Sequence, residues 1–357
     1  MTYALTLGPF HAAWRGPQRF IIDIDGESVS NIDCHNGMNA RNCSDIICRA
    51  ALVDVPKIVA RVCGTCSHAH QLAYAHALEG LNRTQVPTHA RVIRVIVCEL
   101  ERIAMHLAGA ATVCDIVGVT QHSVNLRQLQ FAANTLMLEV IGKRADHVVI
   151  VPGGVTIEPS TRTQQTLQAG ISSFIKALYR SIDHIIDDHR LLARTVNVGI
   201  LSSQVANQLM MGGIVGRASG IPNDTRFSHP YDAYGMFEAS MVTQDGGDVY
   251  ARLMVMLLEA HESAKIIDQA NRQMKSGAPA NPVFESIPGS FVGAVEGPRG
   301  LITYAITASA TDIKKCEIKI DRQLDRSLIQ ALSANALVDD VITIIASTDS
   351  CSACAEH

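Results

Sequence analysis

The chain has 357 residues, 47% of them hydrophobic, so it is long enough to bury a large core. Its formal net charge of −4 and its mixed composition exclude the basic surface that nucleic-acid binding needs, and ten cysteines are too few for a secreted disulfide scaffold. The sequence shows no secretory signal and no apolar run of the roughly 18 residues that span a bilayer, so we expect a reducing compartment and membrane contact only through other subunits.

Apolar periodicity predicts a mainly α-helical chain (α+β), a bundle of long helices with small antiparallel sheets near the N-terminus and before the C-terminus. Thr88 and Ser160 are expected to cap two of the long helices. The predicted hairpins pair residues 20–25 with 28–34 and residues 301–309 with 314–321. The predicted helices cover residues 41–60 with an interruption at Pro56, 67–81, 88–111, 123–141, about 161–185, 248–274, a short stretch from 326 and 338–345. Residues 212–234 are expected to form an ordered loop.

Two Cys-x-x-Cys units are the strongest chemical signal in the sequence. One lies in the first fifth of the chain and the other in the last nine residues. Cysteines at this spacing can direct both sulfurs to one metal ion or cluster. A histidine follows each pair. The residues are Cys63, Cys66 and His70 in the first unit, and Cys351, Cys354 and His357 in the second.

A structural zinc site with four cysteine ligands is one interpretation of these units. In zinc ribbons the second pair usually follows within roughly 15–20 residues, whereas here almost the whole chain separates the pairs. Closing so long a loop costs entropy, and a chain of this length folds without a metal staple. The spacing therefore favours a catalytic or redox centre, since thiolates also bind nickel, copper(I) and iron. If both ends share it, residues 1–357 form a single domain around the centre.

Further motifs lie between the two cysteine pairs. They are Glu99-Leu100-Glu101-Arg102-Ile103 with His106-Leu107, Pro152-Gly153-Gly154-Val155, Gly216-Arg217-Ala218-Ser219-Gly220 with Asp224, Arg226, Pro230-Tyr231 and Tyr234, and Glu296-Gly297-Pro298-Arg299-Gly300. Together with the cysteine units they resemble the large, catalytic subunits of nickel–iron hydrogenases, in particular the membrane-associated, energy-converting branch. That branch is related to the 49-kDa-type, quinone-site subunit of respiratory complex I, which lacks the cysteine pairs. The four cysteines present here favour the hydrogenase side.

The resemblance implies the metal ligands. Cys63 and Cys351 would be terminal thiolates on nickel, and Cys66 and Cys354 would bridge nickel and iron. Carbon monoxide and cyanide complete the iron coordination in this family. Soft thiolates suit both metals.

The resemblance also implies catalytic roles. Cys351 would accept the proton when hydrogen is split, and Arg299 would project over the open site with Asp115 orienting it. Arginine suits this position because it stays charged and offers a fork of donors. Proton transfer needs donors and acceptors within about 3 Å, directly or through one water. Glu296 and Asp349 are the favoured relay residues, since both lie in motifs expected beside the metals, and His11 and Asp45 on the N-terminal side are the alternatives.

Three departures from the family pattern affect the surroundings of the centre. Gly16 and Ser44 stand where the family has glutamates, one for proton relay and one for a structural metal site, and Ser350 replaces a proline. The structural metal site would hold a magnesium or iron ion at His357. His70 is expected to hydrogen-bond a cysteine sulfur.

The function that the resemblance implies is the interconversion of H2 with protons and electrons. Electrons would pass to an iron–sulfur cluster in a separate small subunit, because this chain has no further cysteine group of cluster-binding spacing. Membrane subunits of a complex I-like machine would hold the chain on the cytoplasmic, inner face of the cell membrane. The alternative is a non-catalytic connecting subunit of such a machine, with structural zinc or nothing at the four cysteines.

Overall fold

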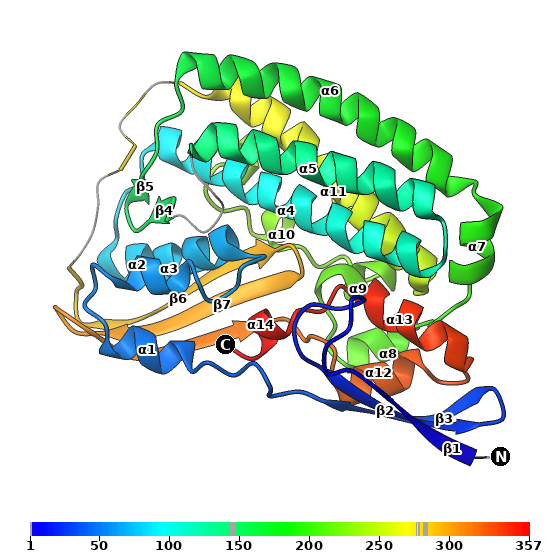
Figure 1. Ribbon diagram of the computed structural model, residues 1–357. Coiled ribbons are helices and arrows are strands. Elements are labelled where there is room, and N and C mark those ends of the chain that lie inside the picture. Colours follow the sequence, from blue (N-terminus) through cyan, green and yellow to red (C-terminus); the bar gives the residue numbers. More distant parts are fainter. Residues whose placement is uncertain (1, 143–147, 276, 278, 281–284) are drawn as a thin grey trace.

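Long helices form one layer of the molecule and a three-stranded sheet lies below them (Figure 1). The computed structural model describes residues 2–142, 148–275, 277, 279–280 and 285–357. The long helices are α4 (Thr88–Ile116), α5 (Thr120–Ile141), α6 (Thr161–Ile186) and α11 (Val249–Gln273), and α3 (Ser67–Asn82) packs between α4 and the sheet. The predicted mainly α-helical architecture with small antiparallel sheets is confirmed.

Burial explains why the long helices differ in sequence. α6 is amphipathic, and it buries a single apolar stripe that recurs every three or four residues against α5 and α11. The Ser160 side chain accepts a hydrogen bond from the Thr163 backbone N–H at 3.1 Å, as predicted for its cap. α4 is buried on almost every side, so its charged residues lie inside the protein. The predicted cap at Thr88 is wrong, because α4 already includes Thr88 and has no side-chain cap.

Two three-stranded antiparallel sheets contain the predicted hairpins, and each has one strand more than predicted. The N-terminal sheet has the order β1 (Thr2–Leu7), β2 (Arg19–Asp25), β3 (Ser28–His35). The C-terminal sheet has the order β6 (Gly289–Gly297), β7 (Gly300–Ala308), β8 (Ile313–Ile320). β6 packs directly on α3, where a Cβ atom at Gly293 would lie 2.1 Å from the Ala73 carbonyl oxygen. A third, two-stranded sheet joins β4 (Ile150–Val151) and β5 (Gly154–Val155).

Short helices fill the connections. The helical segment predicted at 41–60 is interrupted, as expected, but the break comes just before Pro56, which lies in the first turn of the second helix, where proline is tolerated. The segment 212–234, predicted as an ordered loop, contains two short helices, and a 3-10 turn begins at its last residue. These helices are α1 (Cys43–Arg49), α2 (Val55–Val59), α7 (His189–Thr195), α8 (Ser203–Gln208), α9 (Gly213–Ala218), α10 (Thr225–Ser228), η1 (Tyr234–Met236), α12 (Arg326–Leu332), η2 (Val338–Asp340), α13 (Val341–Ser347) and α14 (Ser352–Ala355).

The C-terminal end of the chain lies inside the fold rather than at its edge. Figure 1 shows α14 and the C-terminus beneath the helical layer and close to the sheet of β6–β8. The loop after β1 reaches the same place, where Arg15 forms an isolated β-bridge with Cys351. Across the described ranges, no helix is long and apolar enough to cross a membrane.

Candidate metal centre

The four cysteines of the two pairs come together in the interior. Cys63 lies in the turn after α2, and Cys66 is the N-cap residue of α3. Cys351 is the N-cap residue of α14, which contains Cys354. All four are at most 2% exposed, and the Cys63 and Cys351 sulfurs are 3.9 Å apart. The fold therefore joins the two chain ends at one cluster of thiols.

Arg299 lies against this cluster from the tight turn between β6 and β7. Its Nη1 atom donates to the Cys66 sulfur at 3.0 Å and to the Thr65 hydroxyl at 3.1 Å. The Thr65 hydroxyl also lies 3.2 Å from the Cys63 sulfur and 3.8 Å from the Cys351 sulfur. A permanent positive charge thus faces the thiols.

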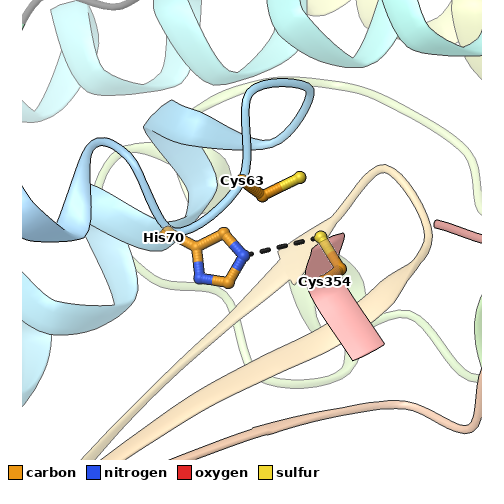
Figure 2. A group of neighbouring side chains, drawn as sticks. All are labelled: Cys63, His70 and Cys354. Carbon is orange, nitrogen blue, oxygen red and sulfur yellow. Dashed lines mark hydrogen bonds between the residues drawn. The ribbon is translucent and has the colours of Figure 1, made fainter. Parts of the chain in front are cut away.

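His70 contacts the cluster from the opposite side. Its Nε2 atom points at the Cys354 sulfur (Figure 2), at a distance of 3.6 Å, and its Nδ1 atom is 2.9 Å from the Tyr304 hydroxyl. Burial lowers the pKa of His70 to about 3, so the ring is neutral. The ligand atoms of Cys63, His70 and Cys354 lie within 4.8 Å of one another, close enough for one metal ion to contact all three. The predicted hydrogen-bonding role of His70 agrees with this position.

The thiols do not behave as ordinary buried cysteines. Hydrogen bonds from Cys354 and Cys63, with the charge of Arg299, hold the pKa of Cys66 well below its usual value. A hydrogen bond with Cys351 lowers the pKa of Cys63. Cys354 differs, because its hydrogen bonds with the other three thiols raise its own pKa. The surroundings of Cys63 and Cys66 therefore favour the thiolate, which is the form that binds metals.

Arg41 holds the two cysteine turns together. Its guanidinium donates to the Arg61 carbonyl at 3.1 Å and to the Val62 carbonyl in the first turn, and to the Ala353 carbonyl at 3.0 Å in the second. The Ser352 backbone N–H donates to the Arg15 carbonyl at 3.0 Å. These bonds fix one pair of cysteines relative to the other.

Asp349, not Asp115, orients Arg299, which corrects the predicted partner. The Arg299 Nη2 atom lies 3.0 Å from an Asp349 carboxylate oxygen, and its Nε atom donates to the Asp349 carbonyl at 2.6 Å. Arg15 contacts the other Asp349 oxygen at 3.1 Å. Asp115 lies at the half-exposed end of α4 and forms its ion pair with Arg127 of α5. Asp349 can reach Arg299 because it lies two residues before Cys351, whereas Asp115 lies at the end of α4 and faces α5.

The Glu296 side chain belongs to a cluster of buried ion pairs in the core. One carboxylate oxygen accepts from Arg217 Nη1 at 2.8 Å, and the other accepts from the Thr225 backbone N–H at 3.3 Å. Burial, together with the charge of Asp224, raises the pKa of Glu296 to about 7. Its contacts within the described residues are with this ionic cluster and not with the cysteines, so the predicted place beside the metals is not what the structure shows.

Motif residues of α4 and of the segment 217–234, together with Glu259 of α11, form the rest of that ionic cluster. Glu99 accepts from Arg226 at 2.8 Å and from the Tyr234 hydroxyl at 2.6 Å. Arg226 also pairs with Asp224 at 2.7 Å, and Glu259 accepts from His106 at 2.9 Å. Buried charges need partners of this kind, so these motifs hold the helices against one another.

His357 and Gly16 lie on either side of the second cysteine turn. The His357 ring nitrogens face the Cys354 and Ile318 carbonyl oxygens, both at 2.9 Å. Both ring nitrogens are thus engaged with backbone carbonyl groups in this arrangement, and a second metal at His357 stays a prediction. Gly16 has a φ of +86°, and a Cβ atom there would lie 2.0 Å from the Ser352 hydroxyl. A glutamate at position 16 would displace the second cysteine turn.

Three further residues build the site without a role assigned to them from the sequence. Thr65 lies within the first cysteine unit, Arg41 contacts both cysteine turns, and Tyr304 of β7 contacts His70 without any signal in its own segment. The sequence indicates Asp349 only as a proton carrier, although its place next to Cys351 could have indicated a role with Arg299.

Comparison with known proteins places this arrangement in context. The family described as "Respiratory-chain NADH dehydrogenase, 49 Kd subunit" matches residues 122–288. The chain is 29% identical to the carbon monoxide-induced hydrogenase of Rhodospirillum rubrum, over 100% of this chain and 99% of that protein. It is 28% identical to the alpha subunit of the membrane-bound hydrogenase of Pyrococcus furiosus, over 99% of this chain and 87% of that protein. It is also 29% identical to an NADH-quinone oxidoreductase subunit of Rickettsia typhi, over 98% of this chain and 97% of that protein.

The fold is shared along the whole chain with a solved structure. A chain of the membrane-bound sulfane sulfur reductase, an archaeal respiratory membrane complex, superposes with a TM-score of 0.91 at 21% identity, covering 100% of this chain and 98% of that one. Residues 122–288 therefore match the 49 kDa-type domain of respiratory NADH dehydrogenases, and the whole chain is similar both to membrane-bound and carbon monoxide-induced hydrogenase proteins and to an NADH-quinone oxidoreductase subunit.

Proposed function

We propose that this chain is the catalytic large subunit of a nickel–iron hydrogenase that interconverts H2 with protons and electrons. The observation that carries the proposal is the cluster of four buried cysteine sulfurs, gathered from both chain ends beneath Arg299. Two relatives that match over nearly the whole chain are named hydrogenases.

The donor set fits such a centre. Buried thiolates repel one another and need cations, and soft sulfur ligands select nickel, iron, copper(I) or zinc. Cys63 and Cys351 would hold nickel as terminal ligands, and Cys66 and Cys354 would bridge nickel to an iron that also binds carbon monoxide and cyanide. When bound, this centre supplies the making and breaking of the H–H bond and the exchange of electrons.

The protein's own residues would then position charge and protons. Arg299 presents a fixed cation at 3.0 Å from the Cys66 sulfur, and Asp349 prevents it from rotating away. Cys351 would accept the proton, as the resemblance to nickel–iron hydrogenases implies, and the Thr65 hydroxyl lies 3.8 Å from its sulfur. The neutral His70 ring contacts the Cys354 sulfur through Nε2 and would help to orient it.

Partners follow from the relatives rather than from this chain. Electrons would leave through an iron–sulfur small subunit. Relatives named as subunits of membrane-bound hydrogenase and of NADH-quinone oxidoreductase support assembly with membrane subunits of a complex I-like machine, on the cytoplasmic face of the cell membrane.

Metal analysis of the purified protein tests the proposal. We expect nickel and iron near one atom each per chain. Zinc alone, or no metal, would instead support the second candidate, a non-catalytic connecting subunit, which the similar identity to the NADH-quinone oxidoreductase protein of Rickettsia typhi favours.

Glu296 is proposed as a carrier in the proton route beyond the centre. A pKa of about 7, raised by burial and by Asp224, suits proton exchange near neutral pH. Its neighbours Thr225 and Tyr231 line a surface cavity, which gives the carboxyl group a path towards solvent.

Replacing Glu296 by glutamine is expected to slow hydrogen turnover while nickel and iron contents stay complete, because the amide cannot carry a proton. The wild-type rate is expected to change near pH 7, where Glu296 gains or loses its proton, and the glutamine variant should lack this pH dependence. Proton–deuterium exchange on the variant measures the effect. Wild-type exchange in Glu296→Gln together with slowed exchange in His11→Ala would place the route on the N-terminal side instead.

A further inference from the structure

We propose that Glu101, held by His68, is a positioning residue that sets the first cysteine turn and so the place of the Cys66 sulfur. The inference rests on the proposal that the four cysteines hold a metal. It concerns how the chain prepares that site, and not which metal occupies it.

Glu101 caps the start of α3 from another helix. Its Oε1 atom accepts from the His68 backbone N–H at 2.9 Å, and its Oε2 atom accepts from the Ala69 backbone N–H at 3.1 Å. The residue is 7% exposed and lies on α4. The first N–H groups of a helix have no partner within the helix, and a carboxylate there also complements the helix dipole.

The cap must come from elsewhere because Cys66 occupies the N-cap position. An N-cap side chain ordinarily accepts from the first turn of its own helix. The Cys66 side chain makes no such bond, and its sulfur instead accepts from Arg299 at 3.0 Å. Glu101 thus satisfies the N–H groups that a serine or aspartate at position 66 would satisfy, and the sulfur stays available to a metal.

His68 fixes the carboxylate in place. Its Nδ1 atom lies 3.0 Å from Glu101 Oε1, and because a carboxylate accepts, Nδ1 carries the hydrogen. His68 is fully buried, so this ion-pair-like contact is shielded from water. The carboxylate therefore has three donors from one turn of α3 and cannot rotate without breaking two of them.

Glu101 and the ionic cluster of the core lie on different faces of α4. Glu99 and Glu101 lie about 200° apart around the helix, so they face opposite sides. Glu99 pairs with Arg226, whereas Glu101 faces α3 and acts on the Cys66 sulfur with a charge opposite to that of Arg299. The first turn of α3 is therefore held by the Glu101 carboxylate, while the sulfur at its N-cap contacts the Arg299 guanidinium.

Cobalt binding to the full chain prepared without metal tests the role of Glu101 separately from enzyme activity. Partners that orient metal ligands typically change metal affinity by about 10- to 100-fold when removed. We expect Glu101→Ala to weaken Co2+ binding by that factor and to shift the cobalt–thiolate absorption bands, with a smaller effect for Glu101→Gln, which keeps one acceptor oxygen.

Two comparisons separate positioning from general stability. His68→Asn keeps a donor close to the Nδ1 position and should retain more Co2+ affinity than His68→Leu. Glu79→Ala is the matched control, since Glu79 is also 7% exposed and also accepts a backbone N–H, from Gly153 at 2.7 Å, but serves Arg94 rather than a cysteine. It should lower the melting temperature without moving the cobalt bands.

Unchanged Co2+ affinity and bands in both Glu101 variants, or equal binding by His68→Asn and His68→Leu, would overturn the inference. Finding zinc alone in the native protein would overturn the proposed hydrogenase function, while the cobalt titration would still decide the role of Glu101.

Discussion

Replacing Cys66 or Cys354 by serine is expected to remove nickel from the protein and abolish hydrogen turnover. Each sulfur is a proposed bridge between the two metals, and a hydroxyl is a harder ligand that keeps its proton at neutral pH. Both residues are at most 2% exposed, so solvent has little access to replace the lost thiolate. Nickel and iron analysis together with H2 uptake measures the result.

Cys114→Ser is the matched control for this experiment. Cys114 is a fully buried cysteine of α4, outside the cluster of four. Burial raises the pKa of its thiol to about 12, so it is an ordinary neutral side chain. This variant should lose stability but keep its metals. Full nickel content and activity in Cys66→Ser or Cys354→Ser would refute the bridging roles.

Replacing Arg299 by lysine is expected to reduce hydrogen turnover by about 10²- to 10³-fold, the usual loss when one preorganised donor is removed from a buried site. The metals should remain, because arginine is not a ligand. Lysine keeps the charge but cannot contact the Cys66 sulfur, the Thr65 hydroxyl and Asp349 together, as the guanidinium does. Turnover per nickel atom is the quantity to measure.

Arg252→Lys shows what loss of a buried guanidinium does elsewhere. Arg252 is also fully buried, but it donates to Ser347 and to the Gly199 and Gly247 carbonyls instead of to a cysteine. Its replacement should lower stability and leave turnover per nickel atom unchanged. If Arg299→Lys loses nickel instead, Arg299 serves to hold the site together rather than to assist turnover.

Local sequence rules determined much of the helical framework. The apolar stripe after Ser160 and its cap predicted α6, because periodicity and capping act within a few residues. The two Cys-x-x-Cys units identified the four residues that meet at the centre, since their spacing already directs two sulfurs the same way. Strands β1 and β6 were missed because β1 is almost wholly exposed and β6 is interrupted by glycines, so neither shows a clear alternation.

Only the tertiary structure decided which charged side chains serve the centre. Asp349 rather than Asp115 pairs with Arg299, and Glu296 turns towards Arg217 rather than the thiols. Glu101 reaches the first turn of α3 from α4. A buried charge is satisfied by whichever partner packing brings within about 3 Å, and that depends on the rotation and crossing of whole helices. Sequence spacing fixes the face of one helix, but not its neighbour across the core.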